Sequence, residues 1–413
     1  MAIITQPTDT VTTTYRPLVW VVNFTAFTPD SIKNCVFSIF VNSTLIAQGR
    51  KAVSYTAPSF LGPTGTEYFF EVDIQQYLQR YYSVRGRRST FGDLNTATQT
   101  ENTDSFDDVY VEFQYEQLNG TTGKLETLPA VDTSSTYYTG IPTRQNGETQ
   151  NLDDYYGVPF ITNAKSYLTK SPLELNVSQT ENAFLSILGQ WNYTKVTTYT
   201  SAGAVINNAY FPTGLTGYPA MGTIGVGKPQ LDAVTNWWSS IAPNWTNCAY
   251  YTVESGLGLV LGPGSIIFIN NSDVRTYTFV ADCNKKLRFH WTNLLGGVDS
   301  YNFSFKELAI RVVSEVFEKP LSTPHLQDDY GKARTNIKAD KSYQCSQIFT
   351  NSEMAWIKDL FYSVEVYIEN PEDNSQYWRV WLSDITVTEK KHPGLFEVTF
   401  TVNLSQDIVT HRI

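Results

Sequence analysis

The sequence predicts a mainly β protein of several domains, and three observations support this fold class. Aromatic residues make up 14% of the chain, with 26 Tyr and 23 Phe, and these residues favour strands together with Thr and Val. Alternation of apolar and polar residues recurs along the chain, whereas helical stripes are few and short. The length of 413 residues exceeds one ordinary domain and is enough for two or three.

The first segment, residues 1–128, is expected to form a β-sandwich-like domain with one short helix. Strands are predicted from Pro17 onward and on both sides of a turn at Asn42. Asp73 is expected to cap a helix whose apolar stripe follows the spacing i, i+3, i+4, i+7, i+8. The stripe consists of Ile74, Tyr77, Leu78, Tyr81 and Tyr82. A further strand has one apolar face, made of Val109, Val111, Phe113 and Tyr115.

The second segment, residues 129–305, is expected to form a β-rich middle domain with insertions. One helix is predicted from a stripe that ends before Pro243, and the stripe consists of Leu231, Val234, Trp238 and Ile241. Two strands are predicted to form a hairpin around residues 270–272. The apolar stretch 257–269 is interrupted by Pro263 and is too short to span a bilayer.

An apolar turn near the end of this segment is unusual. Two strands with aromatic faces, ending at Trp291 and resuming before Tyr301, flank a loop with two leucines and two glycines. A solvent-exposed hairpin tip would normally be polar, so something is expected to cover this one. The cover is either a neighbouring domain or subunit, or the core of the loop's own domain. The candidate interface residues are Asn293, Leu294, Leu295, Gly296 and Gly297.

The third segment, residues 306–413, combines one helix with antiparallel strands. Thr350 and Glu353 have the spacing of a capping box, and the helical stripe behind them consists of Met354, Ile357, Leu360 and Phe361. A strand with Val364, Val366 and Ile368 facing inward follows. The last strand alternates with period two, and its apolar face consists of Phe396, Val398, Phe400, Val402 and Leu404.

The sequence offers no catalytic, cofactor-binding or metal-binding residues, so we predict a protein that is not an enzyme. Gly222, Gly227 and Lys228 fit the spacing of a phosphate-binding loop, but Pro229 stands where that loop needs a hydroxyl side chain. The four histidines are far apart and no two lie at metal-ligand spacing. The four cysteines are expected to be buried free thiols, with a Cys248–Cys283 disulfide as the alternative.

Charge and targeting signals narrow the classes further. The net charge of −10 and the lack of a Lys/Arg stripe argue against a nucleic-acid-binding surface. The amino-terminal residues lack the basic start and apolar core of a signal peptide. We therefore expect synthesis in a cytoplasm and no contact with a membrane.

Three blocks of the sequence resemble the β-rich tail structural proteins of crAss-like and related tailed phages that infect Bacteroidetes. The first block is the strand-rich opening of the chain up to the helix after Asp73. The second has the form aromatic-x-Asn-x-x-Gly-Gly-x-Asp-x-aromatic, here from Trp291 to Tyr301. The third is the helix-plus-strands end of the chain, which is similar to tail hub and tube-like domains. Together they cover about half of the chain, and residues 129–271 match nothing in that family.

The resemblance implies a virion structural protein that is assembled in the host cytoplasm. It would form a ring or hub in the tail or connector, with sixfold or twelvefold symmetry and contacts to other tail proteins. DNA would pass through its channel without specific binding, which an acidic lumen favours by repelling phosphates. An alternative function is a tail fibre or receptor-binding adhesin that recognises surface glycan, because Tyr and Trp also stack on sugars. A glycan-cleaving virion enzyme is a third possibility, for which no acid pair stands out.

Overall fold

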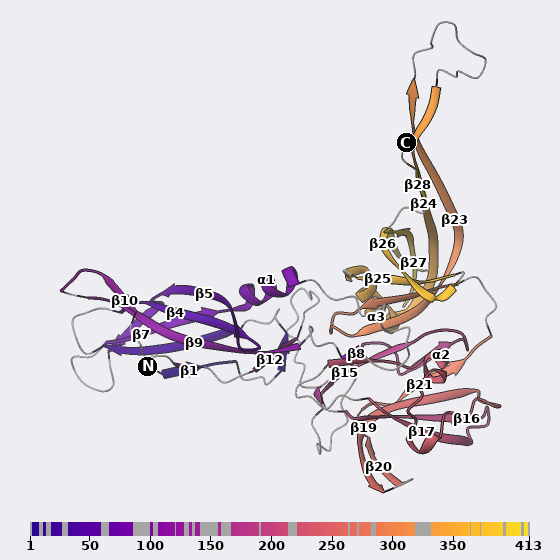
Figure 1. The fold of residues 1–413 in the computed structure, drawn as a ribbon, viewed down its shortest axis with the longest axis horizontal. Helices are drawn as coiled ribbons and strands as arrows, with labels where there is room; N and C mark the ends of the chain where they lie inside the picture. The colour runs from indigo at the N-terminus through magenta and orange to yellow at the C-terminus, as the bar shows by residue number, and fades with distance from the viewer. Residues whose placement is uncertain are drawn as a thin grey trace.

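The computed structural model confirms a mainly β protein in several β-rich bodies (Figure 1). In Figure 1 the amino-terminal sheets extend to the left, the middle sheets lie at the lower right, and the carboxy-terminal strands rise at the upper right. The structure describes residues 2–7, 11–13, 18–26, 32–58, 66–85, 100–101, 106–119, 121–127, 132–133, 137–140, 156–157, 167–189, 191–213, 221–262, 265–270, 272–281, 286–318, 332–363, 365–371, 373–390, 394–405 and 409–411.

The first body is a sandwich of two sheets around one core. One sheet has the strand order β1 (Ala2–Thr5), β3 (Val19–Ala26), β7 (Thr66–Asp73) and β6 (Tyr55–Pro58). The other has the order β2 (Val11–Thr13), β12 (Tyr137–Gly140), β9 (Phe106–Leu118), β4 (Ile32–Val41) and β5 (Thr44–Ala52). Two further strands pair with β9, namely β10 (Leu125–Thr127) and β11 (Asp132–Thr133).

Aromatic side chains from both sheets fill this core, with Trp20, Phe70 and Phe113 fully buried. Helix α1 (Gln75–Arg85) begins after Asp73, whose Oδ1 accepts a hydrogen bond from the Gln75 N–H at 2.9 Å, so the predicted helix and cap are confirmed. The turn between β4 and β5 places Asn42 and the next residue at φ values of 47° and 61°, as a tight hairpin turn requires. The sheet continues past residue 128, since β12 pairs with β9.

The middle of the chain forms two sheets. The smaller sheet has the order β13 (Tyr156–Gly157), β15 (Phe184–Gly189), β18 (Met221–Gly225) and β8 (Thr100–Glu101). The larger one has the order β14 (Glu174–Val177), β21 (Arg275–Phe279), β19 (Tyr250–Gly262), β16 (Tyr193–Tyr199) and β17 (Val205–Pro212), with β20 (Ser265–Asn270) on β19. Both sheets share a core that includes Trp191, Ile224, Tyr251 and Tyr277.

The predicted helix over the stripe from Leu231 to Ile241 is wrong. Helix α2 (Lys228–Asp232) is a single turn that starts with Pro229 in its first positions, and only a short 3-10 turn, η3 (Trp238–Ser240), follows. Ser239 inside that turn has a φ of 53°, which a right-handed helix does not contain. The stripe does not form one helical face, because Leu231 is buried from α2, Val234 is buried from the loop after it, and Ile241 is exposed.

The predicted hairpin around residues 270–272 is also wrong in its pairing. Strands β20 and β21 both exist, but each pairs with β19 and not with the other in the described part of the sheet. The hairpin is instead formed by β19 and β20, one strand earlier in the sequence. Strand type was readable from composition, but partner choice depended on which strands share a core.

The carboxy-terminal body is a closed six-stranded antiparallel barrel. Its strands follow the order β23, β22, β25, β26, β27, β24, and the last pairs again with the first. Strand β28 adds to β24 outside the closed circle. The bounds are β22 (Lys286–Thr292), β23 (Val298–Glu318), β24 (Lys332–Thr350), β25 (Val366–Asn370), β26 (Asp373–Glu389), β27 (Leu395–Leu404) and β28 (Val409–His411).

Helix α3 (Asn351–Tyr362) buries Met354, Trp356, Ile357 and Leu360 in the same core as the barrel strands. Its capping box is confirmed: Thr350 caps the helix, and Glu353 accepts a hydrogen bond from the Thr350 N–H at 2.8 Å. The alternation of β27 is confirmed as well, because its even-numbered side chains from 398 to 402 are buried. Val364 lies outside the described residues.

This barrel begins at Lys286 and not at residue 306. The hairpin of β22 and β23 closes the barrel against β25 and β24, so β23 crosses the expected boundary at residue 305. Beyond the barrel, β23 and β24 continue together into a projecting ribbon, seen rising at the top of Figure 1. We call this ribbon, made of residues 309–318 and 332–341, the arm.

Candidate functional site

The loop between β22 and β23 is built around the Asn293 side chain. Its Oδ1 accepts hydrogen bonds from the N–H groups of Leu295 and Gly297, both at 3.0 Å, and its Nδ2 donates to the Leu168 carbonyl at 2.7 Å. Gly296 has a φ of 86°, in the left-handed region that favours glycine. The first of the two glycines is therefore required by the backbone conformation.

The second glycine is required by a close contact with the middle of the chain. A Cβ atom on Gly297 would lie 2.2 Å from the Leu168 carbonyl oxygen, which is a backbone atom that cannot move aside cheaply. The next residue, Val298, donates its N–H to Ser186 Oγ of β15 at 2.9 Å. The loop thus abuts residues 167–186 of the middle segment, and we call this contact between that segment and the barrel the joint.

The two leucines are covered within the chain. Leu294 and Leu295 are 7% and 4% exposed, and Asn293 is fully buried. The Leu294 N–H donates to Asp359 Oδ2 of α3 at 3.4 Å, so the loop lies between that helix and the middle segment. The leucines are thus buried within the chain, and the loop is hydrogen-bonded both to Asp359 of the barrel's own helix and to Leu168 of the middle segment.

A buried polar cluster that the sequence analysis missed lies beside the loop. His290 is fully buried; its Nδ1 lies 2.8 Å from Ser300 Oγ and its Nε2 lies 3.0 Å from Glu369 Oε1. Glu369 also accepts from the Asn182 N–H at 3.3 Å, which connects the barrel to the middle segment. The alternation of His290 with aromatic residues was visible in the sequence, but its carboxylate partner is far away along the chain.

Two oppositely charged side chains, Arg288 and Glu181, also lie together at the joint. Arg288 donates its Nε–H to the Asn182 carbonyl at 2.9 Å, and its Nη1 lies 3.5 Å from Glu181 Oε2. Burial alone would raise the pKa of Glu181, but Arg288 and the Ser178 N–H more than offset it and hold that pKa below its usual range. Burial lowers the pKa of His290, so the ring is neutral near pH 7.

These groups fix the two bodies to one another and have the geometry of a structural site. Every named member of the cluster has a hydrogen-bonded or ionic partner, and His290 is closed off from solvent by T-shaped contacts with the rings of Phe184 and Tyr377. A general acid or base needs access to a substrate, which this burial denies. Separating a buried ion pair is costly, so the cluster holds the bodies in one orientation.

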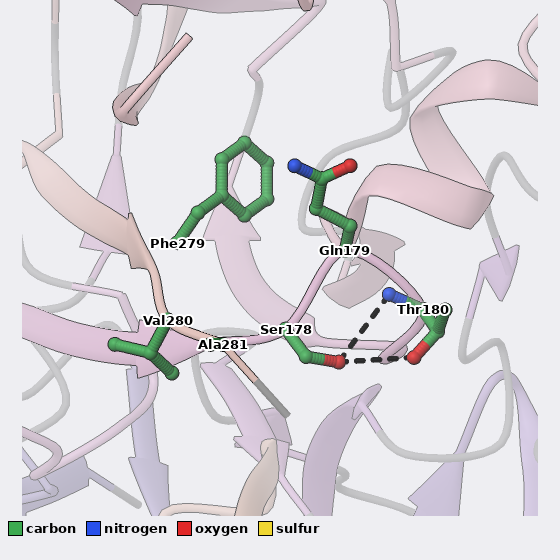
Figure 2. Close-up of a pocket in the computed structure, with 6 residues that line it drawn as sticks. All are labelled: Ser178, Gln179, Thr180, Phe279, Val280 and Ala281. Atoms are coloured by element: carbon green, nitrogen blue, oxygen red, sulfur yellow. Dashed lines mark hydrogen bonds between the residues drawn. The ribbon is translucent and has the colours of Figure 1, made fainter. Parts of the chain in front are cut away.

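Two surface pockets are candidate binding sites. Figure 2 shows the first, a pocket of about 360 Å³ where Ser178 Oγ and Thr180 Oγ1 lie 3.0 Å apart and satisfy each other. The second, about 440 Å³, lies on the outer face of the first body around Glu116. The Glu116 carboxylate already accepts hydrogen bonds from Arg50 at 3.0 Å and from Asn34 at 2.9 Å. Neither lining brings a nucleophile beside a base.

The glycine-rich segment before Lys228 is packing and not a phosphate site. A Cβ on Gly227 would lie 2.4 Å from the Glu181 carbonyl oxygen, so this glycine serves a close backbone contact. Lys228 Nζ is paired with Asp232 Oδ2 at 2.6 Å. Gln230 accepts hydrogen bonds from the N–H groups of Gly227 and Ala183, which occupies the donors that a phosphate would need.

Cysteine chemistry and metal binding find no support in the described residues. Cys35 and Cys345 are free and buried, and burial raises the pKa of each thiol to about 12, which keeps it protonated. Cys248 is also free, whereas Cys283 lies outside the described residues, so the alternative disulfide is not tested. Within the part of the chain that the structure describes, no group of three or more His, Cys, Asp or Glu residues could hold a metal ion.

In the arm, the first residues of β23 beyond the barrel face solvent on both sides of the strand. Residues 309–312 are all exposed, although consecutive side chains of a strand point to opposite faces. Three of the exposed arm residues are large and aliphatic: Ile310, Val312 and Val316 are 61%, 52% and 64% exposed. Among the described residues, strand β28 pairs with the edge of β24 at residues 337–339.

Comparison with known proteins adds no family. No protein-family model matches the chain, and no curated protein matches it significantly. None of the helices in the described residues is long and apolar enough to cross a membrane.

Proposed function

We propose that this chain is a non-catalytic virion subunit that assembles with further copies into a ring or hub in the tail or connector of a tailed phage. The observation that carries the proposal is the arm. Beyond the closed barrel, strand β23 of the paired β23–β24 ribbon presents the aliphatic side chains of Ile310, Val312 and Val316 to water.

An arm of this kind is poorly stable by itself. Two-stranded ribbons are marginal in water, and residues 309–318 extend this one by roughly 30 Å past the barrel. Exposed aliphatic side chains on such an extension mark a surface that another molecule covers. A neighbouring copy is the cover that repeated subunit interfaces of a ring supply.

The joint supports the same role. A subunit that transmits its position around a ring needs its bodies held in one orientation. The buried pair of Arg288 with Glu181, together with the Asn293 bonds, provides this between the middle segment and the barrel. The net charge of −10 suits a channel through which DNA passes without adhering.

The experiment is negative-stain imaging of the purified chain together with its mass in solution. Closed rings of sixfold or twelvefold symmetry are the expected result. A chain that stays monomeric at every concentration, and also with its tail proteins present, would overturn the proposal. Slender trimers would instead favour a glycan-binding tail fibre, and a glycan-binding assay would come next.

A further inference from the structure

The hairpin of β19 and β20, at the bottom of Figure 1, carries a second exposed apolar surface. Between Glu254 and Asp273 the sequence contains no charged residue. In β19, residues from Leu257 onward pair only with β20 in the described sheet, so the hairpin extends beyond β16 and β21. The hairpin is thus another two-stranded ribbon.

One face of this hairpin is packed against its own sheet. Phe268 contacts Tyr210 of β17 with ring centroids 5.6 Å apart. A Cβ on Gly258, which pairs with Phe268, would lie 2.4 Å from the Tyr193 ring, so the tyrosine packs directly on the glycine backbone. Asn192 exchanges two hydrogen bonds with the backbone of Gly258 at 2.8 and 3.3 Å. These contacts hold the hairpin in place.

The opposite face is open and aliphatic. Leu257 pairs with Ile269, and Leu259 pairs with Ile267, so the four side chains lie together on one face. Leu259, Ile267 and Ile269 are 38%, 47% and 36% exposed, and Leu257 is half-buried. We call these four residues the hairpin patch. A contiguous uncharged patch of this kind is typical of the centre of a protein interface.

We infer that the hairpin patch of one copy receives the arm of the next copy, in a head-to-tail contact. The inference rests on the proposed ring function and names its interface. The arm lies at the top of the molecule in Figure 1 and the hairpin at the bottom. The arm of one copy therefore cannot cover the hairpin patch of the same copy. The arm and the hairpin each present exposed aliphatic side chains on a two-stranded ribbon.

Two physical arguments select a second copy as the occupant. Copies with a net charge of −10 repel one another, and contact is least costly where this acidic excess is absent. The hairpin patch carries no charge, and the arm has five Lys or Arg residues against three Asp or Glu residues. Contact between two different surfaces of one chain is heterologous, and repeated heterologous contact gives a ring when the rotation from copy to copy closes. A bilayer is less suitable, because the outer edge of β20 has backbone groups without a neighbouring strand in the described sheet, and lipid cannot satisfy them.

The test uses two double variants of the full chain. The hairpin variant is Leu259→Glu/Ile267→Glu, and the arm variant is Ile310→Glu/Val312→Glu. A matched control, Leu45→Glu/Leu125→Glu, changes two side chains of similar exposure on the first body. Mass in solution is measured for each protein and for an equimolar mixture of the hairpin and arm variants, after circular dichroism has established that each is folded.

We expect each variant alone to associate roughly tenfold or more weakly than the unchanged chain, and the control to assemble normally. The mixture should form a dimer with one copy of each variant. The hairpin variant keeps an unchanged arm, and the arm variant keeps an unchanged hairpin patch. One intact interface can therefore form between the two variants. If a glutamate variant fails to fold, Leu259→Thr/Ile267→Thr preserves strand propensity and replaces it.

Four results would overturn the inference. Rings that persist in both variants would show that other surfaces assemble them, while the proposed ring function would stand. An arm variant that dimerises alone, where the hairpin variant does not, would indicate hairpin-to-hairpin contact. The proteins are also floated with phosphatidylethanolamine–phosphatidylglycerol vesicles. If only the hairpin variant fails to float, and it still assembles, the hairpin patch binds lipid. An unchanged chain that never associates would overturn both the inference and the ring.

Discussion

The same two strands behave differently inside the barrel and in the arm. Within the barrel, Phe303 of β23 and Tyr343 and Cys345 of β24 are buried in a core shared with α3. A few residues further along, Ile310 and Val312 of β23 are more than half exposed. The residue types are similar and the pairing continues, so the difference comes from the other strands that close the barrel. Burial in this chain is decided by closure and not by the strand pattern.

The comparison predicts that apolar residues at the closed joint and in the open arm respond differently to the same substitution. The largest effect is expected for Leu294→Asp/Leu295→Asp. Two carboxylates would be placed where the side chains are 7% and 4% exposed, at a cost of more than about 4 kcal/mol in the free energy of unfolding. Urea unfolding followed by tryptophan fluorescence measures it.

This variant also tests how the loop is covered. If it folds with the stability of the unchanged chain but fails to assemble, the loop is an interface between subunits and not part of a joint within one chain. The structure predicts the reverse, with soluble yield and stability lost first.

A smaller effect is expected at the glycine that touches the middle segment. Gly297→Ala places a Cβ 2.2 Å from the Leu168 carbonyl, and relieving this overlap should cost about 2–4 kcal/mol of stability. Gly394→Ala is the matched control, because Gly394 has a φ of 87° and open space around its Cα, which limits its cost to about 1 kcal/mol. Equal losses in the two variants would contradict the close contact at the joint.

The joint also predicts a pH dependence. Burial lowers the pKa of His290 below its ordinary 6.5, against the raising effect of Glu369. As pH falls below that value, the unfolded ring binds a proton that the folded ring does not, so stability decreases, by up to about 1.4 kcal/mol per pH unit. Unfolding free energies between pH 7 and pH 5 should fall less steeply for His290→Gln. Parallel slopes would show that other groups set the acid sensitivity.

The smallest effect on stability is expected in the arm. Ile310→Glu/Val312→Glu should change the free energy of unfolding of a monomer by about 1 kcal/mol or less, because both side chains are already in water. The same variant should lose assembly, so the two measurements separate folding from association. A large loss of monomer stability would mean that the arm belongs to the folded core and would remove the contrast with the barrel.

Local sequence by itself determined the strand-rich fold class, helices α1 and α3, the caps at Asp73 and Thr350, and the turn after β4. Each of these depends on neighbours a few residues apart, and their periodicity or capping chemistry is visible in the chain. The sequence also showed that the loop with Leu294 and Leu295 needed a cover. The sequence was misleading from Leu231 to Ile241, where apolar residues have helical spacing by chance. A single helical turn, a loop and a 3-10 turn place them at these intervals.

Tertiary structure alone decided which strands pair and which parts of the chain bury one another. The closure of β23 onto β24, the pairing of β20 with β19, and the meeting of Asn293 with Leu168 join residues that are far apart in the sequence. The cluster of His290 with Glu369 and Arg288 with Glu181 was invisible for the same reason. Local pattern states that a side chain prefers burial or a partner, but only the packed fold determines which distant group supplies it.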